Sequence, residues 1–254
     1  MINWRGLYTV FRKEVMRFLK VTVQTVLTPV VTALLYLLVF AQVLEEHVQI
    51  YPGIPYTAFL IPGLTMMSVI QNAFANSSSS LIQSKMTGNL VFLLLSPVSP
   101  GEFMVAFVAA AVVRGLLVGA GVFLVAQFFI TLPVSHVGWA LLFAAMGSAF
   151  LGTLGVVAGV SSDKFEQLAA FQNFVVLPLS FLSGVFYSIH SLPSLWEQVS
   201  RFNPFFYMID GFRYGILGVS DVSPWVSLAV GGTFVLVVMA ICLVMLRTGY
   251  KLRQ

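Results

Sequence analysis

The chain has 254 residues, of which 59% are hydrophobic and only 9% are charged. Its formal net charge is +4 at pH 7. Such a composition is typical of an integral membrane protein, and the small positive charge is not a nucleic-acid-binding footprint.

Six long apolar stretches make up most of the sequence: residues 21–44, 56–77, 103–131, 137–160, 168–187 and 224–246. A helix that crosses the roughly 30 Å hydrocarbon core of a bilayer needs about 20 mostly apolar residues. Backbone groups in lipid must be satisfied within the segment, so each stretch should be helical. A transmembrane barrel would show shorter segments with two-residue alternation. The sequence therefore predicts an all-α polytopic protein with six spans. Since no loop is long enough to bury a core of its own, residues 1–254 form a single membrane domain.

Residues 4–20 precede the first span and are amphipathic at helical spacing. The apolar residues that share one arc of about 120° are Trp4, Leu7, Tyr8, Phe11, Val15, Phe18 and Leu19. We expect residues 1–20 to contain a helix lying along the cytoplasmic membrane surface. Two interpretations stay open: the helix is a lipid anchor alone, or its polar face also contacts a cytoplasmic partner.

Basic loop residues are unevenly distributed across the six-span arrangement. One side holds Arg5, Arg12, Lys13, Arg17, Lys20, Lys85, Lys164, Arg247, Lys251 and Arg253. The other side holds Arg201 and Arg213. Because Lys and Arg are retained in the cytoplasm during insertion, both termini are predicted to be cytoplasmic. His47, His136 and His190 are then external.

Arg114 lies deep in the third predicted span, about eleven residues or roughly 16 Å from its start. An Arg at a helix centre costs about 2.5–3.5 kcal/mol on insertion scales, so it should face the bundle interior, a cavity or a subunit interface. It either contacts an anionic substrate group along a transport path or pairs with carbonyls or a polar side chain such as Gln71 or Gln127.

No pattern for catalysis or cofactor binding is found. Gly147 and Gly152 have the glycine spacing of a phosphate-binding loop, but Thr153 stands where its Lys would be. There is no Cys–His zinc pattern and no Ser–His–acid set. We therefore expect no catalytic, cofactor-binding or metal-binding residue, no enzymatic activity, and an energy source on another chain.

Two parts of the sequence resemble the type-2 permeases of the ATP-binding-cassette exporters, and in particular the bacterial inner-membrane transport permeases of this length. The first is Lys-Met-Thr-Gly-Asn-Leu-Val-Phe-Leu-Leu-Leu-Ser-Pro-Val at residues 85–98. The second begins with Pro-Leu-Ser-Phe-Leu-Ser-Gly-Val-Phe-Tyr at residues 178–187. It continues through Leu192-Pro193, Asn203-Pro204 and Asp210-Gly211-Phe212-Arg213.

The resemblance implies two permease chains, here a second copy of this chain, above two cytoplasmic ATPases that hold the ATP and Mg. Residues 80–100 would form the coupling loop, and residues 188–217 would form re-entrant helices at the outer exit. The ATPase-coupling residues would be Lys85, Met86, Gly88, Asn89, Leu90 and Leu93. The outer-gate residues would be Asn203, Pro204, Asp210 and Arg213. Val91 departs from the family, which often has Glu there, so the docking surface should be more apolar.

The residues themselves agree with these assignments. Residues 85–95 are too few to span a membrane and too apolar to be left in water, so they fit a buried interface or a helix embedded shallowly in lipid. Asp210 and Arg213 stand at i, i+3 and are able to pair on one helical face, either in a membrane-dipping segment or as a weak surface pair.

The sequence thus predicts a permease subunit of an ATP-driven exporter in the bacterial inner membrane. The substrate would be amphiphilic, drug-like or lipid-linked. The alternative is a non-transporting membrane scaffold or assembly subunit, which has no need of an apolar helix between spans two and three.

Overall fold

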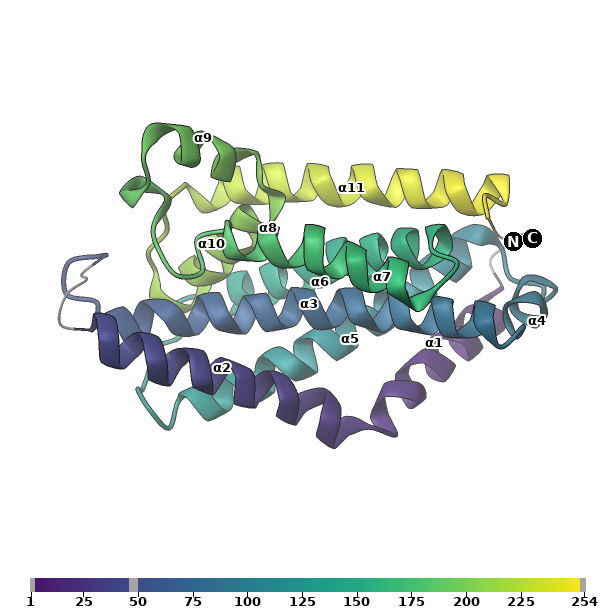
Figure 1. The fold of residues 1–254 in the computed structure, drawn as a ribbon, viewed down its shortest axis with the longest axis horizontal. Helices are drawn as coiled ribbons and strands as arrows, with labels where there is room; N and C mark the ends of the chain where they lie inside the picture. Colours follow the sequence, from purple (N-terminus) through teal and green to yellow (C-terminus); the bar gives the residue numbers. More distant parts are fainter. Residues whose placement is uncertain (1–2, 46–49, 252–254) are drawn as a thin grey trace.

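The structure is a computed structural model that describes residues 3–45 and 50–251, and helices dominate this part of the chain. The helices are α1 (Trp4–Leu19), α2 (Thr22–Leu44), α3 (Tyr56–Met86), α4 (Leu90–Leu94), α5 (Pro100–Ala126), α6 (Val137–Ser161), α7 (Phe165–Phe171), the π-helical η1 (Gln172–Val176), α8 (Leu177–Phe181), the 3₁₀ turn η2 (Ile189–Ser191), α9 (Ser194–Phe202), α10 (Pro204–Leu217) and α11 (Pro224–Thr248). They form an elongated bundle (Figure 1).

Five of the described helices are long and apolar enough to cross a membrane: α2, α3, α5, α6 and α11. These correspond to five of the six predicted spans. The remaining predicted span, at 168–187, corresponds to a helical run of three pieces, α7, η1 and α8, which ends at Phe181. Pro178 has no amide hydrogen to continue the α-helical ladder, and a π-helical turn directly before it accommodates that loss.

Two of the long helices differ from their predicted bounds. The third helix, α3, continues nine residues past Ser77 to Met86, because its polar end is buried against neighbours rather than left at a lipid interface. The next one, α5, begins earlier, at Pro100, where Ser99 and Glu102 form a reciprocal capping box. It ends at Ala126, and the Gln127 side chain then accepts from the Leu132 amide at 3.0 Å.

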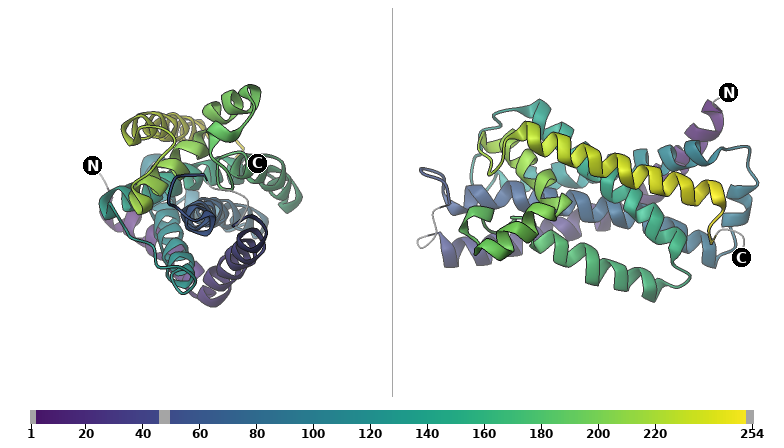
Figure 2. Two further views of the ribbon diagram at one scale, coloured as in Figure 1. Left: turned by 90° about the vertical axis from the view of Figure 1, so that its left-hand side faces the viewer. Right: turned by 90° about the horizontal axis from the view of Figure 1, so that it is seen from above.

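The centre of the bundle is α3, which is largely buried and is surrounded by the other long helices (Figure 2, left). It packs most closely on α6. A side chain built at Gly155 would meet the backbone carbonyl of Phe74, and one at Gly159 would meet Leu81. These small residues let two helix backbones approach, as their four-residue spacing suggests.

The two ends of the bundle differ in character (Figure 1). The termini end holds both chain termini, α1 and α4. The far end holds α9 and α10. His136 is the N-cap residue of α6 and stacks on Tyr214 of α10, and His190 lies in η2, so both lie at the far end. His47 lies outside the described residues.

Candidate functional site

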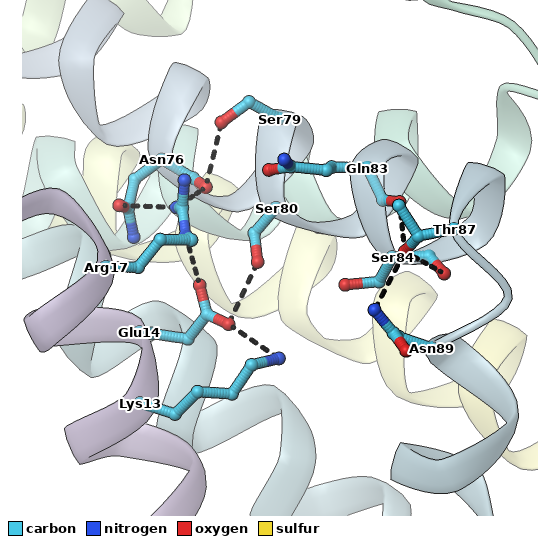
Figure 3. Close-up of polar contacts among 10 residues, drawn as sticks. All are labelled: Lys13, Glu14, Arg17, Asn76, Ser79, Ser80, Gln83, Ser84, Thr87 and Asn89. Carbon is cyan, nitrogen blue, oxygen red and sulfur yellow. Dashed lines mark hydrogen bonds and ion pairs between the residues drawn. The ribbon is translucent and has the colours of Figure 1, made fainter.

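A groove of about 890 Å³ opens at the termini end between α1, the last turns of α3 and the segment that carries α4. Basic side chains of α1 line one wall, including Arg5, Lys13 and Arg17. Polar side chains of α3 line the other, including Ser80, Gln83 and Ser84 (Figure 3). This arrangement makes the groove a cationic surface beside the predicted coupling loop.

Glu14 fastens α1 to α3 at the base of this groove. Its carboxylate is fully buried, accepts from Ser80 Oγ at 2.9 Å and pairs with Arg17 Nε at 3.1 Å. The Arg17 Nη2 also donates to the carbonyl and the side-chain oxygen of Asn76, at 2.7 and 3.0 Å (Figure 3). Sequence reasoning missed Glu14. The available signal was its place four residues from Val10 and Phe18, which share its buried face.

The helix α1 therefore has two faces, one of which packs against the bundle. Val10, Glu14 and Phe18 are buried against the bundle, whereas Trp4 and Tyr8 are exposed. The predicted apolar arc is split between these two environments.

The start of α1 is also tied to the loop before α5. The Asn3 amide donates to Glu102 Oε1 at 2.5 Å, and the Asn3 side chain donates to the carbonyl of Pro97 at 2.8 Å. Since Glu102 also caps α5 through Ser99, one carboxylate holds α1, the loop and α5 together. The segment between α3 and α5 is thus anchored to α1 at the end that precedes α5.

The predicted coupling residues divide into supporting and exposed groups. Leu90 is buried against this chain's own core, together with Val10 and Leu81. Met86, Gly88 and Asn89 are exposed, and Gly88 takes a positive φ of 72° in the turn between α3 and α4. Leu93 lies within α4, and its side chain is outside the described part of the structure.

An exposed apolar ridge on this segment was only partly anticipated. It consists of Met86, Val91, Phe92 and Leu95, of which Phe92 and Leu95 are 75% and 77% exposed. Four exposed apolar side chains on an anchored segment are typical of an interaction surface.

Lys85 has a structural role at the termini end. Its Nζ donates to the carbonyls of Val160 and Ser162, at 2.5 and 3.0 Å, and lies 3.7 Å from Asp163. Lys251 Nζ reaches Asp163 at 2.8 Å. The Lys251 hydrogen bond, with both nearby positive charges, lowers the pKa of Asp163, so this carboxylate is ionised at neutral pH and joins α3, the α6–α7 turn and the C-terminal segment.

At the far end, the four predicted gate residues all lie at α10. Asn203 caps α10 by accepting from the Phe205 amide at 3.0 Å and donates to the carbonyl of Leu179 at 2.7 Å. Pro204 is the first residue of the helix. Asp210 and Arg213 are fully buried and lie 3.8 Å apart. Arg213 also donates to the carbonyl of Gly184 at 2.5 Å and stacks over the ring of Phe59.

Asp221 connects three segments at this end, and sequence reasoning missed it. Its carboxylate accepts from the Tyr51 hydroxyl, from Ser188 Oγ at 2.7 Å and from the Ile189 amide at 3.0 Å. Its own amide donates to Asp210 at 2.8 Å. Burial and then the hydrogen bond to Asp221 raise the pKa of Tyr51, so the phenol remains a donor at physiological pH.

Arg114 faces a cavity of about 490 Å³ between α2, α3 and α5. Its Nη2 donates to Asn72 Oδ1 at 3.1 Å. The partner is thus Asn72 and neither of the two glutamines considered from the sequence. Gln71 lines the same cavity, whereas Gln127 bonds to the backbone of Leu132.

A bundle of apolar spanning helices with an exposed apolar ridge at one end defines a multi-pass membrane protein. Comparisons with known proteins give the family. The family described as "ABC-2 type transporter" matches residues 5–217. The inner membrane transport permease YadH of Escherichia coli K12 is 36% identical over 253 residues, which cover 100% of this chain and 99% of the relative.

More distant relatives are similar over most of the chain. Nodulation protein J of Rhizobium leguminosarum bv. viciae is 26% identical over 85% of this chain and 83% of its own length. That of Rhizobium meliloti strain 1021 is 25% identical over 85% and 82%. The chain belongs to the ABC-2 type transporter family and is a membrane subunit of an ATP-binding-cassette transporter.

Proposed function

We propose that this chain is the permease subunit of an ATP-driven exporter in a bacterial inner membrane, the location named for YadH. It moves an amphiphilic, drug-like or lipid-linked substrate outward, and a separate cytoplasmic ATPase binds the ATP and Mg. The chain itself is not an enzyme and holds no cofactor. The termini end faces the cytoplasm, and the far end faces outward.

The apolar ridge carries this proposal. Phe92 and Leu95 are about three-quarters exposed on a segment that is held by Leu90 from inside and by the Asn3–Glu102 contacts at its end. Residues 80–100 thus present an apolar contact beside a cationic groove. A coupling element needs that combination, because it must transmit a displacement of the ATPase without being deformed by it.

Transport follows from two states of a complex of two permeases and two ATPases. Closure of the ATPase pair on ATP would tilt the bundle through the coupling loop. The energy for this change comes from the different affinities of the ATPases for the two states of the complex. Residues 188–217 would dip into the membrane from outside and form the outer gate, which the Asp210–Arg213 and Asp221 contacts hold. This region and α7–α8 complete a six-span topology as a single permease domain.

The test is a charge placed on the ridge. Phe92→Asp buries an unpaired carboxylate in the ATPase contact, which should abolish co-purification with the partner ATPase while membrane insertion stays normal. Phe128→Asp is the matched control, because Phe128 is 88% exposed at the opposite end of the bundle. Leu90→Asp is a poorer test, because it would also disrupt this chain's own core.

Full ATPase binding by the Phe92→Asp protein would contradict the assigned contact. The alternative, a scaffold without transport, would be favoured if the chain purifies from its native membrane with no nucleotide-hydrolysing partner.

A further inference from the structure

The cavity beside Arg114 extends from Val21, just before α2, along that helix to Tyr36. Polar side chains from three helices line it: Thr28, Thr32, Ser68, Gln71, Asn72 and Arg114. Such groups are costly inside a membrane and are usually functional.

Two hydrogen bonds fix the orientation of Arg114. Asn72 donates its side-chain nitrogen to the carbonyl of Ser68 at 3.1 Å, which turns its oxygen toward Arg114. That oxygen then accepts from Arg114 Nη2 at 3.1 Å. The guanidinium is therefore held from one side by Asn72, at the wall of the cavity.

The donors in this cavity exceed the acceptors available to them. Within the described part of the chain, Arg114 Nε and Gln71 Nε2 are buried and have no hydrogen-bond partner. No carboxylate among the described residues lies within ion-pair distance of Arg114, and none lines the cavity. A partly buried cation without an anion and an unsatisfied amide donor are both stabilised by an oxygen-rich anion.

The outer end of the cavity is apolar and aromatic. Tyr36 lines it and packs against Phe40, Phe181 and Phe186, with ring centroids 6.2, 6.4 and 5.7 Å away. A ligand in this place therefore meets donors at one end and rings at the other.

We propose that this cavity binds the phosphate, pyrophosphate or carboxylate head group of an anionic amphiphile, with Arg114 and Gln71 as its donors. This inference rests on the proposed function and narrows its substrate class: an anionic amphiphile is carried, and a cationic drug is not.

Ligand-dependent thermal unfolding of the purified full-length chain in a neutral maltoside detergent tests this. Dodecyl phosphate should raise the unfolding temperature, since a ligand that binds only the folded state stabilises it by mass action. Dodecyltrimethylammonium, with the same tail and a positive head, should give no rise. Inorganic phosphate at equal concentration should also give none. An equal rise with inorganic phosphate would mean a free-anion site and would overturn the amphiphile assignment.

Arg114→Gln and Gln71→Leu should each weaken the apparent affinity for dodecyl phosphate by about tenfold or more, as expected for loss of a charge-assisted or buried hydrogen bond. Arg247→Gln is the matched control, because it removes one exposed positive charge at the end of α11 and should respond like the unmodified chain. If the Arg114→Gln protein is not monodisperse, the same measurement of dodecyl phosphate affinity on Arg114→Lys and Gln71→Leu tests the site.

An unchanged response of the Arg114 and Gln71 variants, or an equal rise with the cationic amphiphile, would refute the site. The assay needs no ATPase, so its failure is distinguishable from a failure of the Phe92 experiment, which tests the transporter assignment itself.

Discussion

Glu14 is a buried carboxylate on a helix that its composition alone would place on the membrane surface. It brings the cation of Arg17 and the hydroxyl of Ser80 to one point at the base of the cationic groove. The position of α1 beside the coupling loop thus depends on a few polar contacts in addition to apolar packing.

Replacing Glu14 by Ala should destabilise the attachment of α1 by about 1–3 kcal/mol, because the partly buried Arg17 loses its counter-charge. The measurement is limited trypsin cleavage at Arg12 and Lys13, which should become faster. Glu197→Ala is the matched control: Glu197 pairs with Arg201 at 2.8 Å on the more exposed α9, where such a pair contributes about 0–1 kcal/mol. Equal cleavage rates in the Glu14 variant and the unmodified chain would contradict the attachment.

Asp221 has a comparable position at the far end, where it holds the loops before α3 and α9 against α10. In Asp221→Asn, one acceptor oxygen becomes an amide that faces the donors of Tyr51, Ser188 and Ile189. We expect faster amide hydrogen exchange across residues 184–222, with exchange in α5 unchanged. Tyr51→Phe removes one donor and should produce a smaller effect of the same kind; uniform protection in both variants would show that Asp221 does not hold this end.

At the scale of the element, the contact between α3 and α6 depends on the absence of side chains. Gly155→Ala places a methyl group against the carbonyl of Phe74, which cannot move without distorting the central helix. The expected loss is about 1–3 kcal/mol, as for other overpacked sites, measured as a lower unfolding temperature in detergent.

Gly232→Ala is the control for this substitution. Nothing lies within 4 Å of the added methyl group on α11, so the change should be neutral or slightly stabilising, because Ala is the better helix former. If both variants unfold at the same temperature, close approach of α3 and α6 is not what requires Gly155.

The helices that follow from apolar length alone were the predictable ones. The structure places α2 at Thr22–Leu44 and α11 at Pro224–Thr248, within two residues of the predicted bounds. The division of the α7–α8 run into three pieces was not predictable from length and hydropathy, because neither quantity shows where Pro178 disturbs the α-helical hydrogen bonding. The continuation of α3 to Met86 depends on burial of Asn76 and Ser80 against α1, a contact between residues 66 positions apart for Ser80 and Glu14.

In the candidate site, too, some features were predictable from the sequence, and others depend on tertiary contacts. The residue types and spacing around 85–95 predicted an apolar surface. Which side chains point outward, however, depends on the orientation in which α4 packs on the core, and that orientation buries Leu90 and exposes Phe92. Likewise, Arg114 required a partner, but Asn72 was not distinguishable from other polar residues until α3 and α5 were placed together.

At the scale of the whole molecule, the membrane orientation is still a prediction from the distribution of basic residues. Asn89 and His190 are exposed and lie at opposite ends of the bundle, so each is replaced by cysteine in a Cys242→Ala background. An impermeant maleimide added to intact spheroplasts should label the His190→Cys protein, and the Asn89→Cys protein only after lysis. The reverse pattern would invert the topology.

The exposed polar face of α2 argues for a second copy of the chain. Gln24, Thr28 and Thr32 stand on the same face at four-residue spacing and are exposed in the single chain, where lipid would be a poor neighbour for them. A two-fold interface at this face would cover the stripe and enclose the Arg114 cavity between the two copies.

In a Cys242→Ala background, Thr32→Cys should therefore cross-link into a dimer on oxidation in the membrane. Thr233→Cys should not, although both threonines are exposed on spanning helices and donate to the carbonyl four residues earlier, at 3.0 and 2.8 Å. Cross-linking of the Thr233 variant alone would place the interface on α11 instead, and native mass spectrometry that finds one permease per two ATPases would rule out the dimer.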